Sequence, residues 1–278
     1  MSDYKVLIVG YGTVGQNLAK ELSALKPFIY DKYHFENSVL PAYEYDIEEN
    51  DVGDKIVTRN FSGHYNIAFI CVDTPLVGDN KLDTTEVINA INENDADIYV
   101  IKSTVPVETT FNLRQKLGKK IVFSPEYYGS TQHCNNFDFN FTILGGEEND
   151  CIEVQQILQE CYDARHTFHI TDSETAEMVK FMENSWIATK VSFCNQFYEL
   201  AKSYRINYEQ LRELFILDPR VNPAHTFVYR DHPYWDSHCL NKDVAYIANV
   251  NRYGDFLRHI IYYNDIQKAV YKPDEPND

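Results

Sequence analysis

A cysteine and an aspartate stand four residues apart in the stretch HCLNKD, residues 238–243. At the start of a helix, the Cys239 thiol gains from the helix dipole and from a nearby lysine such as Lys242, and both favour the nucleophilic thiolate. The four-residue spacing brings Asp243 onto the same helix face. The pair therefore indicates chemistry through a covalent thiol intermediate. A buried structural cysteine followed by an N-cap aspartate is the local alternative.

Three further groups could share that chemistry. Lys180 and Asn184 repeat the four-residue spacing within a long helical pattern, so they also share a face. Thr104 follows an apolar run and precedes Pro106, and Glu126 comes directly after a proline. Taken singly, each fits an ordinary reading: a solvated lysine beside an asparagine, a turn former, and a surface acid.

The chain opens with a dinucleotide-binding pattern. Gly10, Gly12 and Gly15 form G-x-G-x-x-G between an apolar run and a helical segment. The first two glycines allow a tight turn and close approach to a pyrophosphate, and the third lets helix and strand pack closely. Asp31, 21 residues after Gly10, would accept hydrogen bonds from the adenosine ribose and repel a 2′-phosphate. We expect NAD rather than NADP; a glycine-rich turn without a cofactor is the alternative.

Composition narrows the class of protein. The net charge of −17 argues against nucleic-acid binding, which needs a basic face. An anionic substrate would need local helix N-termini and a few placed cations. No apolar run approaches the ~20 residues of a membrane span, and the opening run is too short for a signal peptide. The six cysteines form no C-x-x-C pair and no zinc-type spacing. We expect a reduced, cytoplasmic protein without a metal or a membrane partner.

Short apolar runs alternate with helical segments in the first half of the chain. The apolar runs cover residues 5–9, a stretch ending at 30–31, and residues 67–72, 98–102, 120–123 and 141–144, and helical segments follow the glycine motif to about residue 25 and cover residues 84–93. This alternation predicts an α/β fold with an N-terminal Rossmann-type, doubly wound parallel sheet. Ligands of such sheets bind at the carboxyl ends of the strands. The segments that follow those ends are Asp73-Thr74-Pro75, Ser103-Thr104-Val105-Pro106 and Ser124-Pro125-Glu126.

A helical pattern replaces the alternation from about residue 171. Ser173 is expected to cap a helix whose first turns carry Glu174 and Glu177, acids that favour the positive end of its dipole. The pattern continues to about Tyr204, or ~45 Å, a length typical of a domain bridge or a dimer seam. Further helices are expected at 208–215, 243–249 and 254–270. We predict an NAD-binding Rossmann domain at 1–170, an all-helical central and dimerisation domain with one long helix at 171–272, and a disordered acidic tail at 273–278.

Longer strings of residues, spread over nearly the whole chain, resemble the UDP-glucose/GDP-mannose 6-dehydrogenase family. The most specific string is AEMVKFMENSWIATKVSFCNQ at 176–196, and the order and spacing of the strings match as well. The other strings are VGYGTVG (9–15), FICVDTP (69–75), KSTVPVET (102–109), FSPEYY (123–128), DPRV (218–221), HCLNKDV (238–244) and YNDIQK (263–268).

The resemblance implies a four-electron oxidation that uses two NAD. The C6 alcohol of a nucleotide sugar, a UDP- or GDP-hexose, becomes a carboxylate through a thiohemiacetal and a thioester on Cys239. Lys180 would stabilise the developing oxyanion with Asn184 as its hydrogen-bonding partner, and Asp243 and Thr104 would position or deprotonate water. Glu126 would assist hydrolysis. The long helix would form the core of a homodimer.

The resemblance also implies which residues bind each ligand. The expected cofactor-binding residues are Gly10, Gly12, Thr13, Val14, Gly15, Asp31, Val72, Thr74, Ser103 and Thr104. The expected substrate-binding residues are Glu126, Tyr127, Lys180, Asn184, Arg220 and Trp235, with Arg220 reaching substrate across the dimer.

Three features depart from the family pattern. The family's glycine-rich GFGGSC aligns with residues 234–239, where Trp235 and Cys239 persist and bulkier residues occupy space that glycine leaves open. Ser130, after Gly129, stands where a second acid is expected. The sequence stops where a third, nucleotide-binding domain would begin, so a short member lacking that domain is expected. It would act on a smaller or differently held substrate, or recruit the missing domain from another chain.

Two other functions therefore remain open. A single-step, NAD-dependent hydroxy-acid dehydrogenase would use the Lys/Asn helix and need no cysteine. A dimeric NAD- or nucleotide-binding protein whose chemistry has lapsed would fit the altered loop. Retention of Cys239 with Asp243 favours the four-electron oxidation.

Overall fold

The structure is a computed structural model that describes residues 4–31, 45–47, 55–57, 63–128 and 139–272. The predicted tail at 273–278 and the Gly129-Ser130 departure lie outside these residues. The chain divides into two compact units. The first unit holds residues 1–77 and 82–180, and the second holds residues 78–81 and 181–278. The predicted domain boundary at residue 170 precedes the long helix, whereas the two units divide within it.

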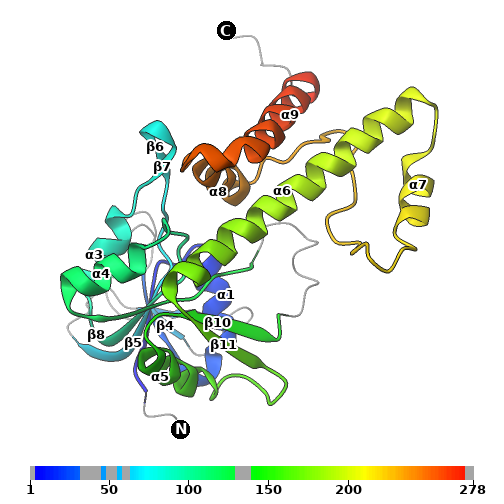
Figure 1. Cartoon of the computed structure of the whole chain (residues 1–278). Coiled ribbons are helices and arrows are strands. Elements are labelled where there is room, and N and C mark those ends of the chain that lie inside the picture. Colours follow the sequence, from blue (N-terminus) through cyan, green and yellow to red (C-terminus); the bar gives the residue numbers. More distant parts are fainter. Residues whose placement is uncertain (1–3, 32–44, 48–54, 58–62, 129–138, 273–278) are drawn as a thin grey trace. The chain divides into compact units, whose positions relative to one another are not determined.

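A mixed sheet forms the centre of the first unit (Figure 1). Its strand order in the described residues is β11-β10-β9-β8-β5-β1-β2-β4-β3. The pairs β9/β10 and β3/β4 are antiparallel, and the other neighbouring pairs are parallel. The strands are β1 (Val6–Val9), β2 (Phe28–Tyr30), β3 (Tyr45–Ile47), β4 (Lys55–Val57), β5 (His64–Ile70), β8 (Asp95–Ile101), β9 (Lys120–Phe123), β10 (Phe141–Gly145) and β11 (Thr167–Thr171). Another small sheet pairs β6 (Leu76–Val77) with β7 (Lys81–Leu82).

Helices cover both faces of this sheet, because successive residues of a buried strand point to opposite faces. Val6 and Ile8 pack in one apolar cluster with residues of α1 (Thr13–Glu21) and α5 (Glu148–Leu158). Leu7 and Val9 pack in the other cluster with residues of α3 (Thr85–Glu93) and α4 (Thr109–Leu117). The short 3₁₀ helix η1 (Ser23–Leu25) also belongs to this unit, whereas η2 (Gly78–Asn80) falls in the second unit. The predicted α/β, Rossmann-type fold is confirmed.

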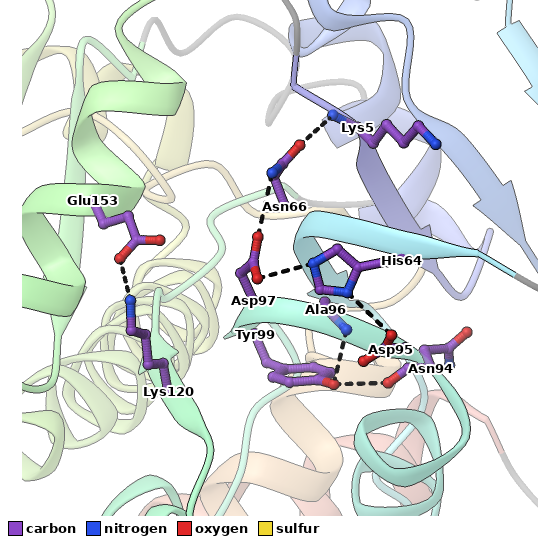
Figure 2. Close-up of polar contacts among 10 residues, drawn as sticks. All are labelled: Lys5, His64, Asn66, Asn94, Asp95, Ala96, Asp97, Tyr99, Lys120 and Glu153. Carbon is purple, nitrogen blue, oxygen red and sulfur yellow. Dashed lines mark hydrogen bonds and ion pairs between the residues drawn. The ribbon is translucent and has the colours of Figure 1, made fainter.

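Polar side chains join the amino-terminal ends of the central strands (Figure 2). His64 of β5 lies between two carboxylates of β8, with Nδ1 3.0 Å from Asp95 and Nε2 2.9 Å from Asp97. Asn66 donates to Asp97 at 3.2 Å and accepts from the backbone N–H of Lys5 at 2.9 Å. These contacts hold β1, β5 and β8 in register at the edge opposite their carboxyl ends.

The long helix α6 (Ser173–Ser203) runs through the division of the chain. Its predicted extent is confirmed, but its cap is Asp172 rather than Ser173. Asp172 Oδ1 accepts from the backbone N–H of Thr175 at 2.7 Å, whereas Ser173 lies inside the helix. Hydrogen bonds from Thr175 lower the pKa of the Asp172 carboxyl.

The second unit is helical in its described residues. After α6 come α7 (Tyr208–Phe215), α8 (His238–Asn249), η4 (Arg252–Gly254) and α9 (Asp255–Tyr271). Ala188 of α6, Trp235, and Leu240 and Val244 of α8 form its buried apolar cluster, against which residues of α9 pack. The α8 helix begins five residues earlier than the predicted 243, because the Ser237 hydroxyl caps it by accepting from Leu240 N at 3.2 Å.

Candidate active site

The turn between β1 and α1 leaves space for a ligand. Gly10 has φ +95°, and a Cβ there would lie 2.6 Å from the carbonyl oxygen of Cys71. A Cβ at Gly15 would lie 2.0 Å from the Gly10 oxygen, so the third glycine lets α1 pack against the turn. At Gly12, by contrast, a Cβ would meet nothing described within 4 Å. The backbone is therefore open at the one glycine that a pyrophosphate must approach.

Asp31 lies directly beside this turn, at the end of β2. Its Oδ2 accepts a hydrogen bond from the backbone N–H of Tyr11 at 2.6 Å. Helix α1 starts at Thr13, which Val14 follows. Its N-cap residue, Gly12, has no side chain that could cap the first N–H groups. Free N–H groups at a helix N-terminus attract a phosphate, and the carboxylate stands where the adenosine ribose binds in such sheets. The residues present fit NAD.

The loops after β5 and β8 are tied to each other. The Ser103 hydroxyl donates to the carbonyl of Val72 at 2.6 Å, and the Thr74 hydroxyl donates to the carbonyl of Thr104 at 2.7 Å. Four residues expected to bind cofactor are thus brought together at the carboxyl edge of the sheet.

The carboxylate of Glu126 has several partners. Its Oε2 lies 3.1 Å from Lys102 Nζ, and its Oε1 accepts from the backbone N–H of Tyr127 at 2.7 Å. Both side chains of this ion pair are largely buried. These contacts fix the orientation of the Glu126 carboxylate. Lys102, which the sequence reasoning passed over within KSTVPVET, orients the acid.

Lys180 is buried on α6, with its Nζ 5.3 Å from the centre of the Tyr127 ring. A cation over an aromatic face is attracted by the ring quadrupole. Two residues expected to contact substrate are therefore neighbours in the first unit. The tyrosine also joins an aromatic group with Phe139 and Phe141.

A buried polar triad stands in the second unit. The Asn184 amide donates to Asp243 Oδ2 at 2.6 Å, and Lys242 Nζ donates to Asp243 Oδ1 at 2.6 Å. Asp243 is 1% exposed, and the other two side chains are also buried. Asn184 was expected to act as the hydrogen-bonding partner of Lys180, and the structure shows its amide in direct contact with Asp243. Asp243 lies inside α8, so it is not an N-cap.

Cys239 is exposed and is the second residue of α8. It precedes Asp243 by four residues, so the thiol and the triad lie on one side of the helix. A buried structural cysteine, the local alternative in the sequence, is wrong. An accessible sulfur at a helix N-terminus, one turn from a buried carboxylate, suits nucleophilic attack on a carbonyl carbon.

Trp235 is buried in the core of the second unit. Its indole N–H donates to the Ser192 hydroxyl at 2.9 Å. Its backbone N–H donates to Asn264 Oδ1 at 2.8 Å, and its carbonyl accepts from Asn264 Nδ2 at 2.9 Å. The side chain thus anchors the segment that leads into α8, and this geometry favours anchoring over direct substrate contact. Asn264, within the YNDIQK string, is a second residue whose role the sequence did not reveal.

Arg220 is the most exposed of the expected substrate-binding residues. Its side chain forms an ion pair with Asp218 at 2.6 Å, and 88% of the arginine side chain is accessible. Its contact with substrate stays a prediction. Across the described residues, no group of three or more His, Cys, Asp or Glu could hold a metal ion, and no helix there is long and apolar enough to cross a membrane.

The glycine turn with its adjacent carboxylate defines the class as an NAD-binding dehydrogenase fold. Comparison with known protein families identifies two domains of a single family. Residues 41–165 match the NAD binding domain of the UDP-glucose/GDP-mannose dehydrogenase family, and residues 174–264 match the central domain of the same family. The chain belongs to the UDP-glucose/GDP-mannose dehydrogenase family, as its motifs predicted, and its cofactor is NAD.

Several similar proteins are named as nucleotide-sugar dehydrogenases. The UDP-N-acetyl-D-mannosamine dehydrogenase of Methanocaldococcus jannaschii is 27% identical over 212 residues, 72% of this chain and 48% of that protein. The UDP-glucose 6-dehydrogenase of Rickettsia felis is 27% identical over 234 residues, 76% of this chain and 51% of that protein. The chain thus spans about half the length of these relatives.

A solved structure supports the fold. That of UDP-D-ManNAc dehydrogenase from Pyrococcus horikoshii superposes with a TM-score of 0.76 at 24% identity, covering 96% of this chain and 69% of that one.

Proposed function

We propose that the protein is an NAD-dependent nucleotide-sugar 6-dehydrogenase that oxidises a C6 alcohol to a carboxylate in two steps. The observation that carries this proposal is the placement of Cys239 on α8. Its exposed sulfur lies one turn before Asp243, which Asn184 and Lys242 hold by hydrogen bonds of 2.6 Å. A single-step dehydrogenase needs no such thiol, so this arrangement favours the four-electron route.

The first step converts the C6 alcohol to an aldehyde. NAD, when bound, would accept the hydride from C6, and the hydroxyl proton would pass to water, for which Asp243 and Thr104 are the candidate hydrogen-bonding partners. Lys180 stabilises the negative charge that develops on the C6 oxygen. Asn184 contributes by holding Asp243 in place and by sharing the α6 face with Lys180.

The second step oxidises the aldehyde while it is bonded to the enzyme. The Cys239 sulfur adds to the aldehyde carbon and the oxygen takes a proton, which gives a thiohemiacetal. Loss of a second hydride, which a second NAD would accept, and of the hydroxyl proton to water would leave a thioester. Water activated by Asp243 then attacks the thioester carbonyl, the C–S bond breaks, and the carboxylate and the thiol are released. Glu126 assists this hydrolysis from its fixed position beside Lys102.

The substrate class is a UDP- or GDP-hexose. The names of the similar proteins support this class. In a chain of net charge −17, a diphosphate needs local cations. Lys180 and Arg220 are the candidates, and Tyr127 is the candidate aromatic contact for the sugar.

We also propose a homodimer built on α6. Apolar side chains recur along one exposed stripe of this helix at spacings of three, four and seven residues, which is the pattern of a helix seam. The stripe consists of Met182, Trp186, Phe193, Phe197 and Leu200, and Tyr204 continues it just beyond the end of α6. Met182 is 74% and Trp186 61% exposed. A self-complementary stripe suits a two-fold axis. Because Cys239 must stay a reduced thiol, we place the reaction in the cytoplasm.

Steady-state assays with a panel of UDP- and GDP-hexoses test the function. We expect two NADH per uronate formed. Cys239→Ser should stop at the aldehyde, with one NADH per product, whereas Cys161→Ser, at a cysteine outside the site, should behave like the wild type. One NADH per product from the wild type, at a rate independent of Cys239, would indicate a single-step dehydrogenase. NAD binding without turnover of any panel member would indicate a binding protein.

A further inference from the structure

Glu177 is a fully buried carboxyl that the proposed reaction does not use. It lies on α6, three residues before Lys180, and has 0% relative exposure. The sequence assigns its charge to the dipole of its own helix. The structure instead directs it toward the N-terminus of α4 (Thr109–Leu117), a different helix.

The carboxylate accepts three hydrogen bonds at that helix start. Its Oε2 accepts from the backbone N–H of Glu108 at 2.7 Å. Its Oε1 accepts from the backbone N–H of Thr110 at 2.9 Å and from the Thr110 hydroxyl at 2.6 Å. Glu108, the N-cap residue, has φ +76° and makes no side-chain capping bond. Glu177 therefore performs in trans the capping that helices usually obtain from their own N-cap residue.

Burial by itself makes an acidic side chain energetically unfavourable at this position. Burial raises the pKa of Glu177 to about 7, and the hydrogen bonds from Thr110 and Glu108 act in the opposite direction. An apolar residue could fill the space without that cost. A polar group retained in such a position points to a need for the specific contacts that it makes.

The capped segment is continuous with the cofactor loop. Helix α4 begins three residues after Pro106, the last residue of Ser103-Thr104-Val105-Pro106. This loop holds the loop after β5 through Ser103 and Thr104. The contacts thus run from α6 through the α4 start to the carboxyl edge of the sheet. On the other side, α6 carries Lys180 one turn after Glu177. One carboxyl thus joins the helix that carries Lys180 to the loop expected to bind NAD.

We infer that Glu177 is a positioning residue that fixes the Ser103–Pro106 loop for NAD binding by clamping the N-terminus of α4 to α6. It touches neither cofactor nor substrate. The inference rests on the proposed role of Ser103 and Thr104 in holding NAD. It does not depend on turnover, because NAD affinity can be measured without substrate.

Glu177→Gln is the primary test. The amide keeps the size of the side chain and an acceptor for Thr110, but it turns an N–H₂ group toward the backbone N–H of Glu108. With the full-length protein, titration calorimetry should give an NAD Kd about 5–10-fold higher than wild type, within the usual range of coupling between sites. Glu174→Gln removes a charge one turn earlier on α6 and is expected to change the Kd less than twofold.

A merely structural role is distinguishable from this. It would lower the unfolding temperature of the apo protein and leave the NAD Kd unchanged at temperatures where the variant is folded by circular dichroism. An unchanged Kd in folded Glu177→Gln overturns the inference. Should that variant fail to fold, Thr110→Val provides a second test, because it removes one of the three donors. It is expected to raise the Kd about 2–3-fold, which is about half of the change in binding free energy expected for Glu177→Gln. Unchanged affinity in Thr110→Val then overturns it. Wild-type protein that binds no NAD would refute the cofactor role of the loop itself.

Discussion

The buried ion pair of Lys242 and Asp243, on the same helix as Cys239, gives a quantitative prediction. Lys242 Nζ and Asp243 Oδ1 are 2.6 Å apart, with 10% and 1% of the two side chains exposed. Removing one partner of a buried pair costs about 3–5 kcal/mol, because the other charge stays buried. Lys242→Met should therefore lower the free energy of unfolding of the second unit by about 3 kcal/mol, at the low end because Asn184 still donates to Asp243.

A double-mutant cycle isolates the pair. Asp243→Leu alone should be at least as costly as Lys242→Met, since it removes the carboxylate to which the buried Lys242 ammonium group donates. The double variant carries neither charge and should recover about 2 kcal/mol of the summed loss. Urea unfolding followed by tryptophan fluorescence measures this, because Trp186 and Trp235 both lie in the second unit.

The control pair is exposed. Arg230 pairs with Glu209 on the surface of the same unit, and Arg230→Met should cost less than about 1 kcal/mol. If the two changes at Lys242 and Asp243 add within about 0.5 kcal/mol, the pair is not coupled and the reasoning is refuted.

Three other changes test separate parts of the account. Asp31→Asn should lower the preference for NAD over NADP, because the carboxylate beside the Tyr11 N–H no longer repels a 2′-phosphate; equal affinity ratios in both proteins, measured by calorimetry, would count against this role. Hydrogen bonding to Asp95 raises the pKa of His64 above its usual 6.5, so its stabilising effect should be full below pH 6.5 and fade as the pH rises through the higher folded value. The Tm difference between wild type and His64→Gln should accordingly shrink from pH 5.5 to 8.5, and a constant difference would contradict it. Asn264→Leu leaves two backbone groups of Trp235 without their partner and should cost about 2–4 kcal/mol in urea unfolding; a loss below about 1 kcal/mol would show that the segment does not need this anchor.

Local patterns were sufficient for much of the fold. The β1 strand, the glycine turn and α1 follow one another in sequence, so periodicity and turn chemistry locate them. The long helix was predicted within a residue at its C-terminal end, since few breakers interrupt it. The antiparallel direction of β10 was not predicted, because strand direction depends on partners distant in the chain. The helices α4 and α5 and the edge strand β11 were also not assigned, and β11 is largely exposed, so its residues give little apolar signal.

The candidate site likewise contains some residues that the sequence reveals and others that it does not. The sequence pointed to Cys239 with Asp243, and to Asn184 with Lys180, because the two members of each pair are four residues apart. Lys102 and Lys242 belong to the same motifs, but nothing in the sequence shows which carboxylate each one meets. Glu177 and Asn264 act on backbone groups far along the chain, at separations of 67–69 and 29 residues. Such contacts exist only once the elements have packed.

The central claim is that Cys239 carries the substrate as a thioester. The most direct test is mass spectrometry of the tryptic peptide of residues 231–242, taken from acid-quenched turnover mixtures of Asp243→Asn with NAD and a substrate that the wild type oxidises. Loss of the Asp243 carboxylate should slow hydrolysis, so the account predicts a peptide heavier by the mass of the uronyl group, absent without NAD. An unmodified peptide from reactions that still form NADH, with a wild type yielding two NADH per uronate, would contradict it.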